Sequence, residues 1–116
     1  MSKKKAVRLE ALQREYKRLC DSLVTVGYIS QGSVLDRSKL RRPRSGYQWT
    51  RKVAQKTITV ALSQEQFQAV SKAVENRRKL AKTLTKMESL SRRILFNSLP
   101  DTHRRKPLNQ KVLSAI

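Results

Sequence analysis

The sequence YQWTRKVAQKTITVAL, residues 47–62, decides the fold of this chain. In residues 47–53 Tyr47, Trp49, Arg51 and Val53 alternate with Gln48, Thr50 and Lys52. Residues 57–60 are all β-branched, so both halves favour a strand. The pattern predicts a β-hairpin with Ala54 and Gln55 at its tip. Ala and Gln are poor residues for a two-residue type I′ turn, so a wider loop over the same pairing is the alternative.

The register of this hairpin separates an apolar face from a polar one. Trp49 pairs with Val60 in it, and Lys52 pairs with Thr57. The apolar face would contain Tyr47, Trp49, Ile58, Val60 and Leu62. The polar face would contain Gln48, Thr50, Lys52, Thr57 and Thr59. A one-residue slip would mix the two sets, so their separation supports this register.

A long helix is predicted directly after the hairpin, over residues 64–97. The preceding SQEQ, residues 63–66, has the form of a capping box, and no Pro or Gly follows until Pro100. A helix of this length spans about 50 Å. Arg77 interrupts the apolar stripe, so a break or bend near residues 75–78 is the alternative to the continuous helix that we favour.

A second helix is predicted over residues 6–26. Its apolar residues recur at spacings of three and four, and they are Leu9, Leu12, Tyr16, Leu19, Leu23 and Val26. This heptad spacing places them on one stripe, and a helix this short is marginal in water without a partner. We therefore expect the two helices to pack antiparallel, in the manner of a coiled coil, with Cys20 as a small apolar residue between them.

The predicted fold class is α+β: an N-terminal helix, a two- or three-stranded antiparallel sheet and a long C-terminal helix. One domain would cover residues 6–98, with a basic loop and the hairpin at 32–62 and a short third strand near 32–35. Residues 1–5 would form a basic arm and residues 99–116 a basic tail. Such a fold buries little area, so we expect a homodimer or docking on a larger partner.

The balance of charge indicates a polyanionic partner. The net charge is +19, from 27 Lys and Arg against 8 Asp and Glu. Like charges repel on folding, whereas each phosphate contact releases counterions, so nucleic acid is favoured over an anionic membrane or an acidic protein. No apolar run approaches the ~18–20 residues of a membrane span. The chain contains one Cys and therefore forms no internal disulfide, which is typical of a cytoplasmic protein. Within the cytoplasm, we expect the protein to associate with the nucleoid.

Candidate binding residues form three groups. Eight cations without an acid lie between residues 37 and 56, and these are Arg37, Lys39, Arg41, Arg42, Arg44, Arg51, Lys52 and Lys56. The long helix adds Arg77 and Arg78, for which a solvated helix face is the alternative, and the tail adds Arg104, Arg105 and Lys106. Tyr47 and Trp49 either stack on unpaired bases or, as we favour, pack the hairpin on the long helix.

Catalytic options are few. The one His, His103, lies in the basic tail, most carboxylates have a cation three or four residues away, and the three glycines form no phosphate-cradling loop. We therefore predict a protein that is not an enzyme and that carries no cofactor and no metal.

The stretches GSV (32–34), GYQWTRKV (46–53) and KTITV (56–60) resemble a family of small, uncharacterised bacterial proteins found beside, or labelled as, transposases of insertion sequences. The likeness covers roughly residues 8–98. Many members carry a Cys-rich insertion before the hairpin, but residues 37–45 contain no Cys here, so no metal site is carried over. The resemblance implies an association with mobile DNA and no particular reaction.

The function expected from these features is that of a non-catalytic nucleic-acid-binding accessory protein in bacterial DNA transposition or recombination. DNA is favoured over RNA, a transposase or recombinase is the expected protein partner, and no membrane is involved. The alternatives are an RNA-binding structural subunit of a ribonucleoprotein and a coiled-coil adaptor for an acidic protein partner.

Overall fold

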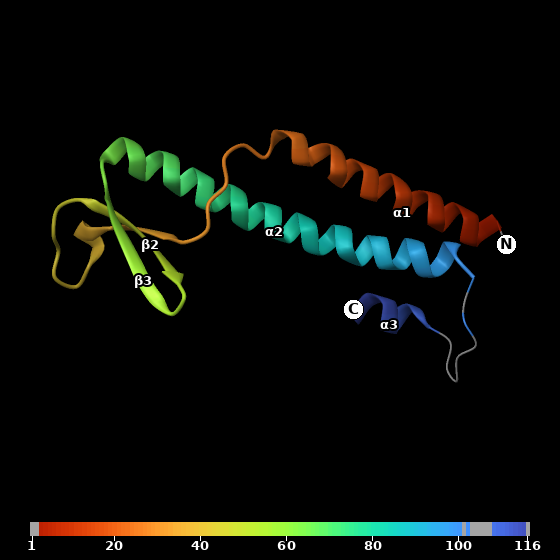
Figure 1. The fold of residues 1–116 in the computed structure, drawn as a ribbon. Helices are drawn as coiled ribbons and strands as arrows, with labels where there is room; N and C mark the ends of the chain where they lie inside the picture. Colours follow the sequence, from red (N-terminus) through yellow and green to blue (C-terminus); the bar gives the residue numbers. More distant parts are fainter. Residues whose placement is uncertain (1–2, 101, 103–107, 116) are drawn as a thin grey trace. The chain divides into compact units, whose positions relative to one another are not determined.

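A computed structural model describes residues 3–100, 102 and 108–115. Its elements are α1 (Lys3–Ser22), the 3-10 helix η1 (Leu23–Thr25), β1 (Ser33–Asp36), the 3-10 helix η2 (Arg37–Lys39), β2 (Tyr47–Val53), β3 (Lys56–Leu62), α2 (Gln64–Ser98) and α3 (Gln110–Ala115). An N-terminal helix, an antiparallel sheet and a long helix follow one another along the chain (Figure 1). The α+β class predicted from the sequence is confirmed.

The chain divides into two compact units. We call Val26–Leu80 the sheet unit, and Met1–Thr25 together with Ala81–Ile116 the helical unit. The helix α2 starts in the sheet unit and ends in the helical unit.

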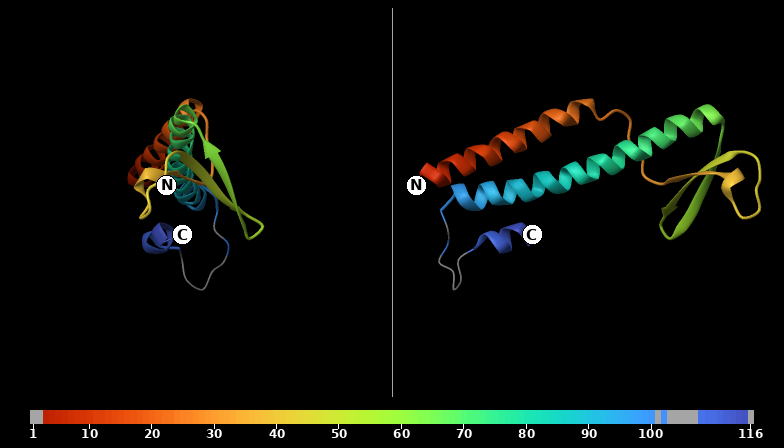
Figure 2. Two further views of the ribbon diagram at one scale, coloured as in Figure 1. Left: turned by 90° about the vertical axis from the view of Figure 1, so that its left-hand side faces the viewer. Right: turned by 180° about the vertical axis from the view of Figure 1, so that it is seen from behind.

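The core of the helical unit lies between α1 and the later part of α2. Leu19, Met87 and Leu90 form a buried cluster, against which four partly buried side chains pack, namely Leu12, Tyr16, Cys20 and Leu23. Near one end of the pair, Leu9 and Asn97 line the same hollow, so the two helices run antiparallel, as the right-hand view of Figure 2 shows. The apolar stripe predicted for α1 therefore packs against α2. Leu95 of α2 does not join this core, because its side chain is 51% exposed.

The helix α1 begins earlier than the sequence predicted. Lys3, Lys4 and Lys5 form its first turn instead of an arm. Lysine is a good helix former and no Pro or Gly separates these residues from Ala6, so nothing in the sequence stops the helix there. In the predicted tail, α3 buries Leu113, which is 4% exposed.

The sheet unit contains three antiparallel strands in the order β1-β2-β3. Trp49 pairs with Val34 on one side and with Val60 on the other, and Lys52 pairs with Thr57, which confirms the predicted register and adds the third strand. The ring of Tyr47 stacks on Phe67 of α2, with 4.4 Å between ring centroids. This stack attaches the start of β2 to the first turns of α2, whereas Ile58 and Val60 on the same face of the sheet stay exposed.

The tip of the hairpin is tighter than the wider loop that the residues at its tip had suggested. Val53 pairs with Lys56, so Ala54 and Gln55 alone form the turn, with φ of +48° and +66°. Two positive φ angles are the mark of a type I′ turn, whose twist matches that of the flanking strands. The pairing of the strands thus outweighs the unfavourable turn residues.

The start of α2 is fixed by the predicted capping box. The backbone N–H of Ser63 donates to Oε1 of Gln66 at 2.9 Å, and the backbone N–H of Gln66 donates to Oγ of Ser63 at 3.1 Å. From there α2 continues without interruption past Arg77. The continuous helix is confirmed, and the helix is not broken near residues 75–78.

Candidate nucleic-acid interface

The basic loop between β1 and β2 is closed at its base by the backbone of Arg37. Its N–H donates to the carbonyl oxygen of Gly46 at 3.0 Å. Its own carbonyl oxygen accepts from the N–H of Leu40 at 3.2 Å and from that of Arg44 at 3.1 Å. These three hydrogen bonds hold the loop residues 38–45 in a compact turn between two strands that the sheet already fixes.

Asp36 caps the start of this loop. Its Oδ1 accepts from Oγ of Ser38 at 2.7 Å and from the backbone N–H of Ser38 at 3.0 Å. The hydroxyl hydrogen bond, followed by the backbone one, lowers the pKa of the Asp36 carboxyl below its ordinary value. The carboxylate is therefore ionised at neutral pH and is engaged within the loop, where it orders the cationic residues that follow.

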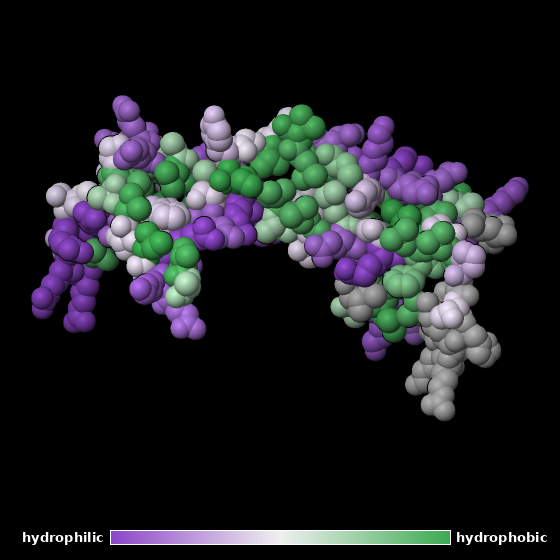
Figure 3. Space-filling view, viewed as in Figure 1, coloured by the Kyte–Doolittle hydropathy of each residue, from purple (hydrophilic) through white to green (hydrophobic). Residues whose placement is uncertain are grey.

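The loop presents a concentrated positive surface. Its exposed cations are Lys39, Arg41, Arg42 and Arg44, and no acidic residue occurs between Arg37 and Gln64. Hydrophilic side chains project outward from the part of the sheet unit that holds the strands (Figure 3). Exposed Arg and Lys side chains on a short, well-ordered loop are suited to contacts with phosphate oxygens.

Arg37 has a different place from the other loop cations. Its side chain is half-buried, and its Nε donates to Oε1 of Gln48 at 3.2 Å. The sequence assigned Arg37 to phosphate contact. In the structure it connects the loop to β2, and its backbone closes the loop.

The hairpin cations meet a cation of α2 at a shallow hollow in the sheet unit. The hollow has a volume of about 380 Å³ and is lined by Gln31, Gly32, Ser33, Thr50, Arg51, Lys52, Thr57 and Arg77. The structure thus brings together two of the predicted groups, Arg51 and Lys52 from β2 and Arg77 from α2. Lys56 and Arg78, also predicted to bind, are exposed but do not line it.

The two aromatic residues both make contacts within the sheet unit. Tyr47 is half-buried against Phe67, and the indole Nε1 of Trp49 donates to the carbonyl oxygen of Gln31 at 2.9 Å. For Tyr47 this is the packing on the long helix that we favoured, whereas Trp49 is tied to the segment that leads into β1. The predicted tail cations Arg104, Arg105 and Lys106 lie outside the described residues.

Sequence reasoning missed part of the hollow. Ser33 and Gly32 line it because β1 pairs Ser33 with Thr50. The sequence suggested a strand here but gave no register for it, because four residues are too few to show an alternating pattern.

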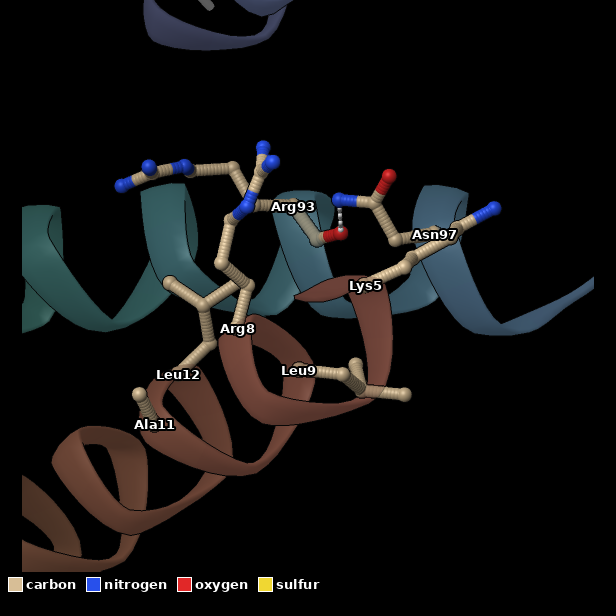
Figure 4. Close-up of a pocket in the computed structure, with 7 residues that line it drawn as sticks. All are labelled: Lys5, Arg8, Leu9, Ala11, Leu12, Arg93 and Asn97. Carbon is tan, nitrogen blue, oxygen red and sulfur yellow. Dashed lines mark hydrogen bonds between the residues drawn. The ribbon is translucent and has the colours of Figure 1, made fainter. Parts of the chain in front are cut away.

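The helical unit has a hollow of its own, shown in Figure 4. It has a volume of about 480 Å³ and is lined by Lys5, Arg8, Leu9, Ala11, Leu12, Arg93 and Asn97. Arg8 of α1 and Arg93 of α2 extend toward the same side, and Nε of Arg93 is buried without a hydrogen-bond partner. Three apolar side chains share this lining, so it offers a phosphate fewer polar groups than the hollow of the sheet unit does.

Two further observations concern the described residues only. Within residues 3–100, 102 and 108–115, no three His, Cys, Asp or Glu side chains are gathered as a metal ion would require. In the same part of the chain, the helices lack the length or apolar character needed to cross a bilayer. Compared with known proteins, the chain matches no protein-family model, no curated protein and no solved structure.

Proposed function

We propose that this chain is a non-catalytic protein that binds nucleic acid through the sheet unit. The cations of the loop and the hairpin would neutralise backbone phosphates, with Arg78 of α2 and the tail cations Arg104, Arg105 and Lys106 adding contacts. The observation that carries the proposal is the run Lys39–Lys56, which contains seven exposed cations and no acidic residue. Phosphate contacts of this kind supply affinity that does not depend on sequence.

Duplex DNA is the nucleic acid that we propose. The resemblance of residues 8–98 to a family found beside insertion-sequence transposases supports this setting, that of an accessory protein in bacterial DNA transposition or recombination. A transposase or recombinase would be its protein partner, and the nucleoid its place in the cell.

Self-association as a homodimer is part of the same proposal. β3 is an outer strand of the three-stranded sheet, and its Ile58 and Val60 are each 44% exposed. β3 contains no Pro, so its outer edge offers free backbone groups to another strand. Two copies joined in this way would double the number of phosphate contacts on one duplex.

The salt dependence of duplex binding tests the proposal directly. If about seven phosphates are contacted, the logarithm of the association constant falls by about six for each tenfold rise in salt. Fluorescence anisotropy with a labelled duplex, measured from about 50 to about 200 mM salt, gives this slope. An affinity that hardly changes over this range contradicts the proposal.

A matched pair of triple variants locates the interface. Arg41→Gln, Arg42→Gln and Arg44→Gln together remove three exposed charges from the loop, and the slope should fall by about three. The control is Arg14→Gln, Lys17→Gln and Lys82→Gln, which removes three exposed charges from the helical unit. Both proteins lose the same net charge. If they bind equally weakly, total charge and not the loop determines binding.

Two further measurements separate the alternatives. Competition between duplex DNA and a structured RNA shows which polymer is preferred, and a clear preference for RNA would move the chain to the ribonucleoprotein class. Purification after nuclease treatment shows whether a protein partner is retained. An acidic partner that remains while no nucleic acid binds would indicate an adaptor instead.

A further inference from the structure

The hollow of the sheet unit joins three segments that are far apart in the sequence. Residues 31–33 approach it from the start of β1, the hairpin supplies one wall, and Arg77 comes from α2. Besides its cations, the lining offers the hydroxyl groups of Ser33, Thr50 and Thr57. Among the residues that line it there is no carboxylate.

Hydrogen bonds next to the hollow hold these segments in place. Nδ2 of Asn76 donates to the carbonyl oxygen of Tyr28 at 3.0 Å, and the N–H of Ser30 donates to the carbonyl oxygen of Ala73 at 3.1 Å. The segment that enters β1 is thus attached to α2 within one turn of Arg77. The backbone of this segment is therefore held against α2 before any ligand arrives, which reduces the entropy lost on binding.

The opposite wall is fixed by a close backbone approach at Gly32. Its φ is +101°, and a Cβ placed there would lie 2.6 Å from the carbonyl oxygen of Thr50. The hydrogen bond from Trp49 to Gln31 lies on the same stretch of chain. The absence of a side chain at Gly32 is what lets the segment before β1 lie this close to β2.

The charges around the hollow are not compensated within the described part of the chain. Neither Arg51, Lys52 nor Arg77 forms an ion pair there, and Arg77 is half-buried. The acidic residue nearest to Arg77 along α2, Glu75, is paired with Lys79 at 3.1 Å. Three like charges around one concave surface repel one another, and a bound anion would relieve this repulsion.

From this arrangement we propose that the hollow binds one phosphate group of the nucleic-acid backbone. The inference rests on the proposed function and adds to it a defined binding site for one backbone phosphate. The guanidinium of Arg77 donates to the phosphate from α2, Lys52 donates from the face of the sheet that it shares with Thr50 and Thr57, and the hydroxyl groups complete the shell. One phosphate held in this way would fix the orientation of the sheet on the duplex, whereas the loop cations contribute affinity.

The test compares Arg77→Gln with Lys72→Gln. Lys72 is an exposed cation of the same helix and the same unit, it does not line the hollow, and its replacement removes the same charge. Arg77→Gln should weaken duplex binding about tenfold at low salt and lower the salt slope by about one, because a charge-assisted hydrogen bond is lost. Lys72→Gln should change the affinity much less, and circular dichroism confirms that both variants fold.

Inorganic phosphate is the second probe, and it needs no variant. Titrated into the full chain, it should shift the amide signals of Gly32, Thr50 and Thr57 in heteronuclear NMR spectra. The same shifts should persist in Lys72→Gln and disappear in Arg77→Gln.

The outcomes distinguish this inference from the proposed function. If the duplex binds with its steep salt dependence but Arg77→Gln behaves as Lys72→Gln and phosphate shifts none of the three amides, the hollow is not a phosphate site while the function stands. If phosphate shifts them but Arg77→Gln leaves duplex binding unchanged, the hollow takes free phosphate, and its role on the backbone is overturned. If no duplex binds at all, the function itself is wrong.

Discussion

The indole of Trp49 donates a hydrogen bond from Nε1 to the backbone carbonyl oxygen of Gln31, with 2.9 Å between the two atoms. This contact ties the middle of β2 to the segment that leads into β1. It gives the only tryptophan of the chain a structural role, and it makes the packing and base-stacking interpretations of that side chain separable by experiment.

We predict that Trp49→Phe lowers the free energy of unfolding by about 1 kcal/mol, the net worth of one hydrogen bond, and leaves duplex affinity unchanged. Urea unfolding followed by circular dichroism measures the first quantity, and anisotropy with a labelled duplex measures the second. Tyr47→Phe is the control, because it keeps the ring that stacks on Phe67. Weaker binding of Trp49→Phe without a loss of stability would show instead that the indole meets a base.

The turn at Ala54 and Gln55 gives the second prediction. Both residues adopt a positive φ, a backbone conformation that residues other than Gly, Asn and Asp disfavour. Replacing the pair by Asn and Gly, as Ala54→Asn with Gln55→Gly, should raise the free energy of unfolding by about 1 kcal/mol. Gln55→Val should lower it, because a β-branched residue is strained there. If thermal unfolding is the same in both variants, the two-residue turn is not formed.

The same hairpin shows what the sequence could and could not predict. Its register followed from the separation of apolar from polar residues, since the pairing of Trp49 with Val60 leaves the two sets on opposite faces. The shape of the tip did not follow, because Ala and Gln disfavour the type I′ turn that they form. The strands, held by their pairing and by the stack of Tyr47 on Phe67, determine the turn instead.

The sequence identified the cations of the candidate site, but it did not predict which of them come together at the hollow. Arg77 reaches the hollow through the tertiary hydrogen bonds of Asn76 and Ala73 with the chain near Tyr28. Such contacts leave no periodic pattern in a single sequence. The structural role of Arg37 was not predictable for a similar reason. Its Nε donates to Gln48, but nothing in the sequence distinguishes Arg37 from the other cations of the run.

A matched pair of glycine variants tests the wall of the hollow. Gly32→Ala should lower the free energy of unfolding by about 2 kcal/mol, because the new Cβ meets the Thr50 carbonyl oxygen at 2.6 Å in a conformation that Ala disfavours. Gly27→Ala also has a positive φ, +81°, but its Cβ meets only the side-chain Nδ2 of Asn76, at 3.2 Å. It should therefore cost less, about 1 kcal/mol. Equal losses in chemical denaturation would show that the close approach at Gly32 is not real.

The last prediction concerns pH and the loop cap. Hydrogen bonds from Ser38 lower the pKa of Asp36 in the folded chain, so the contribution of this carboxylate to stability is present above its unfolded pKa. As the pH falls through the folded pKa, the contribution is lost and the loop loosens. Ser38→Ala removes the largest cause of the shift, and the pKa of Asp36, followed by NMR titration, should rise.

Lys79→Gln is the matched control for this titration. Its partner Glu75 has a pKa that is lowered by Lys79, so that variant should raise the pKa of Glu75 and leave that of Asp36 where it is. Below the folded pKa of Asp36, the amide signals of Arg41 and Arg44 should shift in the unsubstituted chain, because protonation removes the acceptor that orders the loop. Signals that stay constant through this pH range would mean that the backbone hydrogen bonds of Arg37 hold the loop without the cap.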